Sequence, residues 1–144
     1  MIVCGWALVI FILSNQPAAV SSGQSGGIVG YLQQAMPGVS TAILTFLVRK
    51  SAHIIAYFVL GILMYRALRI TIRRWRTRTV ASFALLSCSL YAVTDEIHQL
   101  FVPGRSGELR DVMIDSIAAL VGVGLCVWLM RRWALRKSIV TSNQ

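Results

Sequence analysis

Charge is scarce in this sequence. Only 13% of its 144 residues are Asp, Glu, Lys or Arg, about half of the roughly 25% that soluble domains carry. Hydrophobic residues make up 56% of the chain, which is far too many for a disordered protein. The length allows one domain at most. These properties exclude a large soluble enzyme and favour a small helical protein that crosses a membrane several times.

Several kinds of site are also missing. The sequence has 3 cysteines, and because all of them lie in apolar runs, no disulfide framework or CxxC metal clip is expected. There is no phosphate loop, dinucleotide fingerprint or serine nucleophile elbow, so no cofactor is predicted. The net charge of +9 could suggest nucleic acid, but the basic residues stand in short clusters between apolar runs, where they set membrane orientation. No nucleic-acid partner is therefore expected.

Four apolar segments predict an all-α fold, a transmembrane four-helix bundle in a single domain over residues 1–144 of a plasma-membrane protein. The expected spans cover residues 2–15, 42–65, 80–102 and 112–130. The first is shorter than the ~20 residues that a spanning helix needs, which leaves open whether that span begins upstream of residue 1. Residues 14–41 have no charge and are rich in Ser, Gly and Gln, so we expect a loop with at most a short surface helix near residues 28–36.

The basic residues predict the topology. Ten of the 14 lie in the connection over residues 66–78 or after Met130. By the positive-inside rule both regions are cytoplasmic, and an even number of spans then places both termini inside. The other four basic residues share the outer side with all five acids.

Three of the predicted helices carry a polar stripe at helical spacing. The stripes are Lys50, His53 and Tyr57; Asp95, His98 and Gln99; and Asp111 and Asp115. Ionisable groups inside a membrane are costly and usually pair across a bundle, so we expect the three stripes to converge at one depth near the outer face. Arg49 is expected to reach the headgroups instead.

Plainer interpretations stay open for each group. Asp95 and Glu96 could form ion pairs with Lys50 or Arg105 that only lock helices together. Asp111 could serve mainly as a helix N-terminal acid, with Arg105 or Arg110 as its partner.

Two further assignments concern metals and helix packing. A divalent metal on His53, Asp95, His98 and Asp115 is conceivable, but no tight ligand motif exists and Lys50 would repel the ion, so no metal is predicted. The spacing of Ala118 and Gly122, with Gly124 following and Gly61 on the second span, predicts close helix packing.

The same residues carry a resemblance. The segments in question are Ser14-Asn15-Gln16-Pro17, Lys50-Ser51-Ala52-His53 with Tyr57, Asp95-Glu96-Ile97-His98-Gln99, Val102-Pro103-Gly104-Arg105 and Asp111-Val112. In this order they resemble the VanZ-like family of small membrane proteins, named after a protein linked to resistance to the glycopeptide teicoplanin. Members often have Asn where Asp115 stands and Gly where Ala118 stands. The resemblance implies a role at the bacterial cell envelope and no settled mechanism.

The leading hypothesis is an outward-facing polar pocket that binds a membrane lipid, a lipid-linked wall precursor or a lipidated glycopeptide. The ligand-binding candidates are Gln16, Lys50, Tyr57, Gln99, Arg105, Asp111 and Asp115. A second hypothesis is an enzyme that modifies an envelope lipid or wall precursor, with Asp95, Glu96, His98 and His53 as the acid and base groups. A third is a structural bundle whose polar network only fixes packing. A proton-coupled transporter is disfavoured because no inverted repeat is evident, and the oligomeric state is left open.

Overall fold

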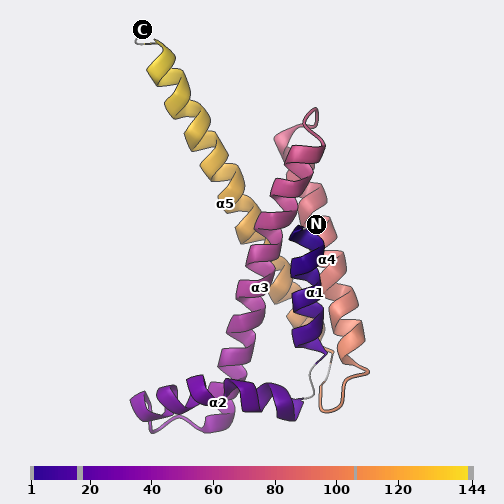
Figure 1. Ribbon diagram of the computed structural model, residues 1–144, viewed down its shortest axis with the longest axis vertical. Helices are drawn as coiled ribbons and strands as arrows, with labels where there is room; N and C mark the ends of the chain where they lie inside the picture. The colour runs from indigo at the N-terminus through magenta and orange to yellow at the C-terminus, as the bar shows by residue number, and fades with distance from the viewer. Residues whose placement is uncertain (1, 16–17, 106, 143–144) are drawn as a thin grey trace.

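The computed structural model describes residues 2–15, 18–105 and 107–142, with the backbone alone for residues 18–25 and 135–142. Over this part of the chain, all regular structure is helical, and five helices follow one another (Figure 1). They are α1 (Ile2–Ser14), α2 (Ala18–Ala35), α3 (Thr41–Thr71), α4 (Thr77–Gln99) and α5 (Leu109–Ser142). The all-α prediction is confirmed.

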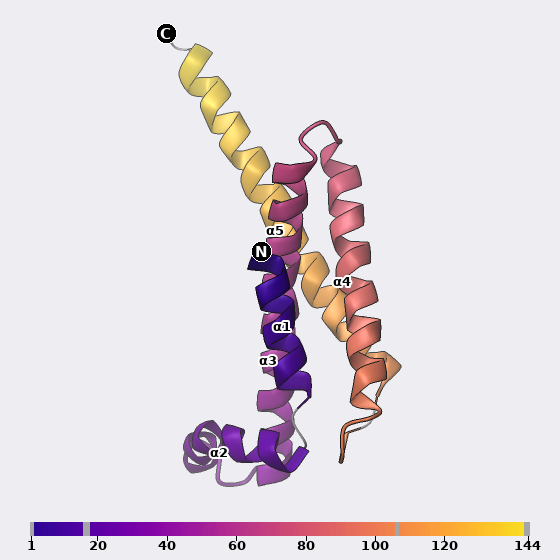
Figure 2. The same ribbon diagram turned by 45° about the vertical axis from the view of Figure 1, so that its right-hand side comes forward.

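Three helices form the body of the molecule. α3 and α4 are antiparallel neighbours, α5 packs against both, and α1 lies along α3 and α4 (Figures 1 and 2). α2 runs across the end of the bundle where α3 begins. In the described residues, α3, α4 and the 109–134 part of α5 are long and apolar enough to cross a membrane, whereas α1, with 13 residues, is shorter. The molecule therefore has the build of a membrane protein.

The second helix is where the predicted four-helix count differs from the structure. Residues 18–35 form one 18-residue helix, although a loop with at most a short surface helix was expected. Serine and glycine weaken a helix, but no proline interrupts this segment, and Pro37 follows just after its end. A low helix propensity was thus mistaken for an absent helix.

The helix ends also differ from the predicted spans. α3 continues to Thr71 and α5 to Ser142, well into the basic segments, because arginine is a good helix former. α4 stops at Gln99 rather than residue 102. The chain then reverses through a turn in which Gly104 has a φ of 75°, a left-handed conformation that glycine adopts without strain.

The core is small and the outside is apolar. Along α4 the buried side chains recur every three or four residues up to Asp95, as one helical face requires, and Glu96 widens that face; the buried residues are Val80, Ala84, Cys88, Ala92, Asp95, Glu96 and Gln99. Large apolar side chains such as Leu86 and Ile117 remain exposed. Exposed apolar faces around a partly polar interior are what helices surrounded by hydrocarbon present.

Small residues let α3 and α5 approach each other closely. A methyl group added at Gly61 would lie 2.9 Å from the Cα atom of Ala119, and one added at Gly122 would meet the backbone of Phe58. Both positions therefore need glycine for the helices to touch. The predicted packing role of Gly61 and Gly122 is confirmed, whereas Gly124 faces open space.

Candidate functional site

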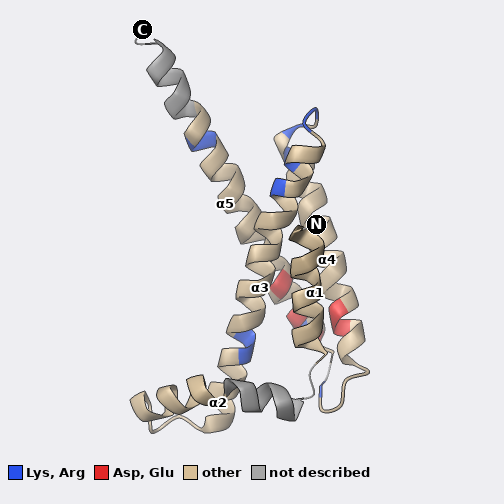
Figure 3. Ribbon diagram, viewed as in Figure 1, with Lys and Arg blue, Asp and Glu red and all other residues tan. Residues whose placement is uncertain are grey.

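The charged residues separate into two regions (Figure 3). All five acids lie in the half of the bundle next to α2, which we call the acidic end. They are Asp95, Glu96, Glu108, Asp111 and Asp115. The opposite half, the arginine end, carries Arg66, Arg69, Arg73, Arg74, Arg76, Arg78, Arg131 and Arg132. Four of the basic residues share the acidic end with the carboxylates: Arg49, Lys50, Arg105 and Arg110.

Two ion pairs join α3 to α5 at the acidic end. The Lys50 ammonium contacts the Asp111 carboxylate, with side chains 23% and 16% exposed. One turn deeper, His53 Nδ1 lies 3.6 Å from Asp115 Oδ2, and the Asp115 side chain is only 3% exposed. The i, i+3 spacing on α3 thus meets the i, i+4 spacing on α5, as the polar stripes predict.

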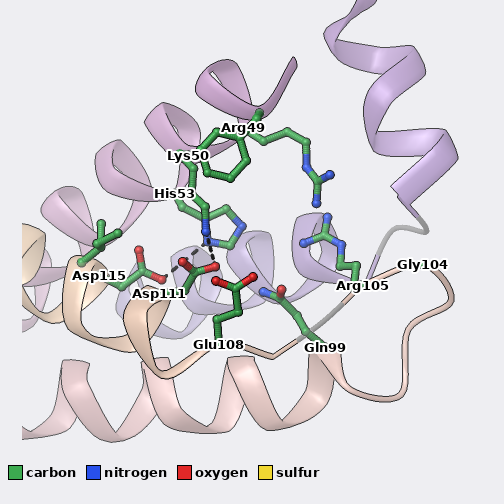
Figure 4. Close-up of a pocket in the computed structure, with 11 residues that line it drawn as sticks. Arg49, Lys50, His53, Gln99, Gly104, Arg105, Glu108, Asp111 and Asp115 are labelled. Atoms are coloured by element: carbon green, nitrogen blue, oxygen red, sulfur yellow. Dashed lines mark ion pairs between the residues drawn. The ribbon is translucent and has the colours of Figure 1, made fainter. Parts of the chain in front are cut away.

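These pairs border a cavity of about 180 Å³ between α3, α5 and the turn that follows α4 (Figure 4). Its walls combine three cationic and three acidic side chains with amide, imidazole and apolar groups. The lining residues are Phe46, Arg49, Lys50, His53, Gln99, Gly104, Arg105, Glu108, Asp111, Ile114 and Asp115. Pockets for drug-sized ligands measure about 300–1,000 Å³, so this cavity has room for a head group rather than for a whole large ligand.

The guanidinium groups of Arg49 and Arg105 point toward one another across the cavity (Figure 4). Arg105 donates to the Leu13 carbonyl over 3.3 Å, which ties the turn to α1. Burial and, next, the neighbouring positive charge of Arg49 lower the pKa of the Arg105 guanidinium below its ordinary value. The side chain of Arg49 lines the cavity, and its expected reach to the lipid headgroups stays a prediction.

The carboxylates of α4 do not line the cavity, and they accept hydrogen bonds from other groups. Asp95 Oδ2 accepts from Ser14 Oγ over 2.8 Å and from Gln99 Nε2 over 3.3 Å. Glu96 accepts the backbone N–H of Glu108 over 2.9 Å. Among these α4 side chains, Gln99 lines the cavity, and its hydrogen bond to Asp95 connects that buried carboxylate to the site.

The ion-pair partners of the acids differ from those considered in the structural interpretations of the sequence. Asp111 does stand in the first turn of α5, but its partner is Lys50, while Arg110 pairs with Glu108 over 3.2 Å. The described ion pairs do not include one from Asp95 or Glu96 to Lys50 or Arg105.

Two further candidates lie apart from the cavity lining. Tyr57 is fully buried below His53, with the two rings stacked at 6.4 Å. His98 faces α1, where its Nε2 lies 3.1 Å from Asn15 Oδ1. Gln16 lies outside the described residues.

The four residues considered as acid and base groups are therefore not gathered on one surface. His53 lines the cavity, whereas Asp95, Glu96 and His98 do not. Within the described chain, no group of three or more His, Cys, Asp or Glu side chains is placed to hold a metal ion. The chemistry available at the cavity is that of ion pairing, hydrogen bonding and one imidazole beside a carboxylate.

Sequence reasoning missed three contributors to the site. Arg49 stands four residues before His53, and this i, i+4 spacing already placed both on one face. Glu108 reaches the cavity because the turn after α4 folds back, which local spacing does not reveal. Ser14 supplies the hydroxyl for Asp95 from 81 positions away in sequence, a contact that only the packing of α1 creates.

Comparison with known proteins gives one family. The profile described as VanZ/LLP1 matches residues 1–131 of the chain, which is nearly its whole length. The match includes α1 to α4 and most of α5, and hence every described residue of the cavity. Neither the curated proteins nor the solved structures include a match to the chain.

Proposed function

The chain belongs to the VanZ-like family of membrane proteins, and from this premise we propose that it is a multi-pass plasma-membrane protein of the bacterial cell envelope. In this proposal its cavity opens to the outer side and holds the polar part of an amphiphilic ligand. The ligand is a lipid-linked wall precursor or a lipidated glycopeptide such as teicoplanin.

The orientation follows from the arginines. Basic residues gather on the cytoplasmic side of membrane proteins, and the turn between α3 and α4 carries Arg73, Arg74 and Arg76. With the arginine end inside, the acidic end and its cavity face outward. Labelling of introduced cysteines tests this, in a background with Cys4, Cys88 and Cys126 replaced. Gly38→Cys should react with an impermeant thiol reagent in intact cells and Arg74→Cys should not; the reverse pattern would overturn the orientation.

The single observation that supports ligand binding is the cavity itself. Lys50, Asp111, His53 and Asp115 form ion pairs at its wall instead of filling it, and about 180 Å³ stays open between them. A network that only locked helices together would gain from closing this space, since voids cost stability. An open, charged and water-accessible space at the end of a bundle suits a polar head group.

Antibiotic susceptibility tests the proposal. Cells expressing the protein should tolerate more teicoplanin than cells without it, and Lys50→Ala, Asp111→Asn and Arg105→Ala should each remove most of that protection at equal protein abundance. Arg110→Ala is the matched control, because this arginine is exposed and does not line the cavity. Full protection by all three cavity variants would refute the proposal.

A second function is favoured by one observation, the imidazole of His53 beside the Asp115 carboxylate in the cavity. A carboxylate that orients a histidine is a common general-base arrangement. The protein would then modify an envelope lipid or wall precursor. Mass spectra of lipids and muropeptides should show a product that depends on expression and is lost in His53→Gln; identical spectra with and without the protein would exclude this function.

A further inference from the structure

An apolar groove adjoins the cavity. It measures about 330 Å³, lies between α3 and α5, and has almost no polar surface. Its lining residues are Ile54, Ile55, Phe58, Ile114, Ile117, Ala118 and Val121. Ile114 also lines the cavity, so the polar and the apolar space share a wall.

The two spaces follow each other along the same helix faces. On α3, Lys50, Ile54 and Phe58 stand four residues apart, and on α5, Asp111 and Val121 are ten residues apart. At 1.5 Å per residue, this α5 segment is ~15 Å long. One leaflet of the hydrocarbon core is also ~15 Å thick, half of the ~30 Å of the bilayer. The cavity and the groove together therefore span a length of α5 similar to the thickness of one leaflet.

The cavity's charges indicate which head group would suit it. Lys50 pairs with Asp111, and the Arg49 and Arg105 guanidinium groups point toward one another across the cavity (Figure 4). Two like charges repel, and an anion between them would be attracted to both. Guanidinium groups bind phosphate through paired hydrogen bonds.

We propose that the cavity and the groove form one site for a phosphate-bearing lipid. Its phosphate lies between Arg49 and Arg105, and a hydrocarbon chain lies in the groove over Ile114 toward Val121. This inference rests on the proposed function and adds the class of ligand and the course of its chain.

Binding to the purified full-length protein in detergent micelles tests the inference by titration calorimetry with three probes. Dioctanoyl phosphatidic acid carries both the phosphate and the chains, dioctanoylglycerol carries the chains alone, and inorganic phosphate carries the head alone. We expect the phosphatidic acid to bind at least tenfold more tightly than either partial probe. Equal affinity for phosphatidic acid and dioctanoylglycerol would overturn the phosphate assignment.

Two sets of variants separate the parts of the site. Arg49→Gln with Arg105→Gln should weaken phosphatidic acid binding at least tenfold and leave dioctanoylglycerol unaffected. Arg73→Gln with Arg74→Gln, which removes two positive charges in the turn between α3 and α4, is the charge-matched control. If the double variant does not elute as folded protein, Arg49→Lys with Arg105→Lys retains the charges without the paired hydrogen bonds and should still weaken binding severalfold. Unchanged affinity in a folded variant would overturn the head-group site.

The groove is tested by filling it. Val121→Trp should weaken binding of both lipid probes at least fivefold, while Leu120→Trp, half exposed and outside the groove, should not. If the two tryptophan variants bind alike, the chain does not lie in the groove and this inference fails. The proposed function would then survive provided that the cavity variants still remove protection from teicoplanin. If the cavity variants lose neither protection from teicoplanin nor lipid binding, both the proposed function and this inference are refuted.

Discussion

The two ends of the bundle use the same kinds of residue in opposite ways. At the acidic end, cations meet carboxylates from another helix and border a cavity. At the arginine end, most of the arginines are exposed, and in the described chain none pairs with an acid. The difference lies in the acids, all of which stand within residues 95–115. Positive charge alone orients such a protein, whereas opposite charges brought together from separate helices can build a site.

Between the two ends, the backbones of α3 and α5 approach each other closely. Gly61 packs against Ala119 and Gly122 against Phe58. On one side of this contact the helices hold the cavity, and on the other α5 leans away from α3 (Figures 1 and 2). The contact therefore holds α3 and α5 together beside the cavity, and substitutions in it should have the largest effect on the free energy of unfolding.

The first prediction is that Gly61→Ala and Gly122→Ala each lower the free energy of unfolding by about 3 kcal/mol, the upper range for overpacking. The added methyl group would meet backbone atoms of the facing helix, which cannot rotate away. Unfolding by SDS in detergent micelles measures the change. Gly124→Ala, where the methyl group meets open space, is the control and should stay within about 0.5 kcal/mol of the parent protein. Equal effects at Gly122 and Gly124 would contradict the close contact.

The second prediction removes one member of an ion pair at the acidic end. Lys50→Ala leaves the Asp111 carboxylate largely buried opposite an empty space and should cost about 2 kcal/mol, less than for a fully buried pair because both side chains retain some exposure. The double substitution Lys50→Met with Asp111→Leu should recover most of this loss, because no charge is then left unpaired. The same unfolding measurement decides it. A double variant no more stable than Lys50→Ala would show that the charges do not act as a pair.

The convergence of these charges could be predicted from the sequence. The spacing of Lys50 with His53, and of Asp111 with Asp115, determines a helix face, and the order of spans determines the depth. Both facts are local or follow from counting, so Lys50 and Asp111 could be placed near each other without coordinates. The close packing of Gly61 and Gly122 was predictable for the same reason.

The predictions that failed concerned the direction in which a side chain points from its helix, or whether a segment forms a helix at all. His98 shares spacing with Asp95 and Gln99, yet it turns toward α1 because Asn15 and Phe11 occupy that side. α2 was missed because propensity is a weak guide when nothing breaks a helix. Sequence spacing identifies the residues that share a helix face, but the neighbouring helices decide which groups each side chain meets.

The third prediction concerns the support behind the cavity. Ser14→Ala removes the hydroxyl that donates to the buried Asp95 carboxylate. Because a hydrogen bond to a charged group is worth about 1.5–3 kcal/mol, this variant should lower the free energy of unfolding in SDS by about that amount. Ser87→Ala removes a hydroxyl that bonds only to its own helix at Phe83 in an exposed place and should stay within about 0.5 kcal/mol. If both serine variants unfold alike, the α1 contact does not hold Asp95 in place.

The smallest effect is expected at the arginine end. Arg74→Gln removes an exposed charge in the turn between α3 and α4, and an exposed side chain without a fixed partner contributes within about 0.5 kcal/mol. The unfolding free energy should therefore match that of the parent at low and at high salt. Lys50→Ala should instead lose stability at both salt concentrations, because its ion pair is largely buried and weakly screened. A loss above 1 kcal/mol in Arg74→Gln would mean that the arginine end also has a partner, and that its charges do more than orient the chain. An unchanged value would leave the carboxylates, rather than the cations, as the feature that separates a charged surface from a site.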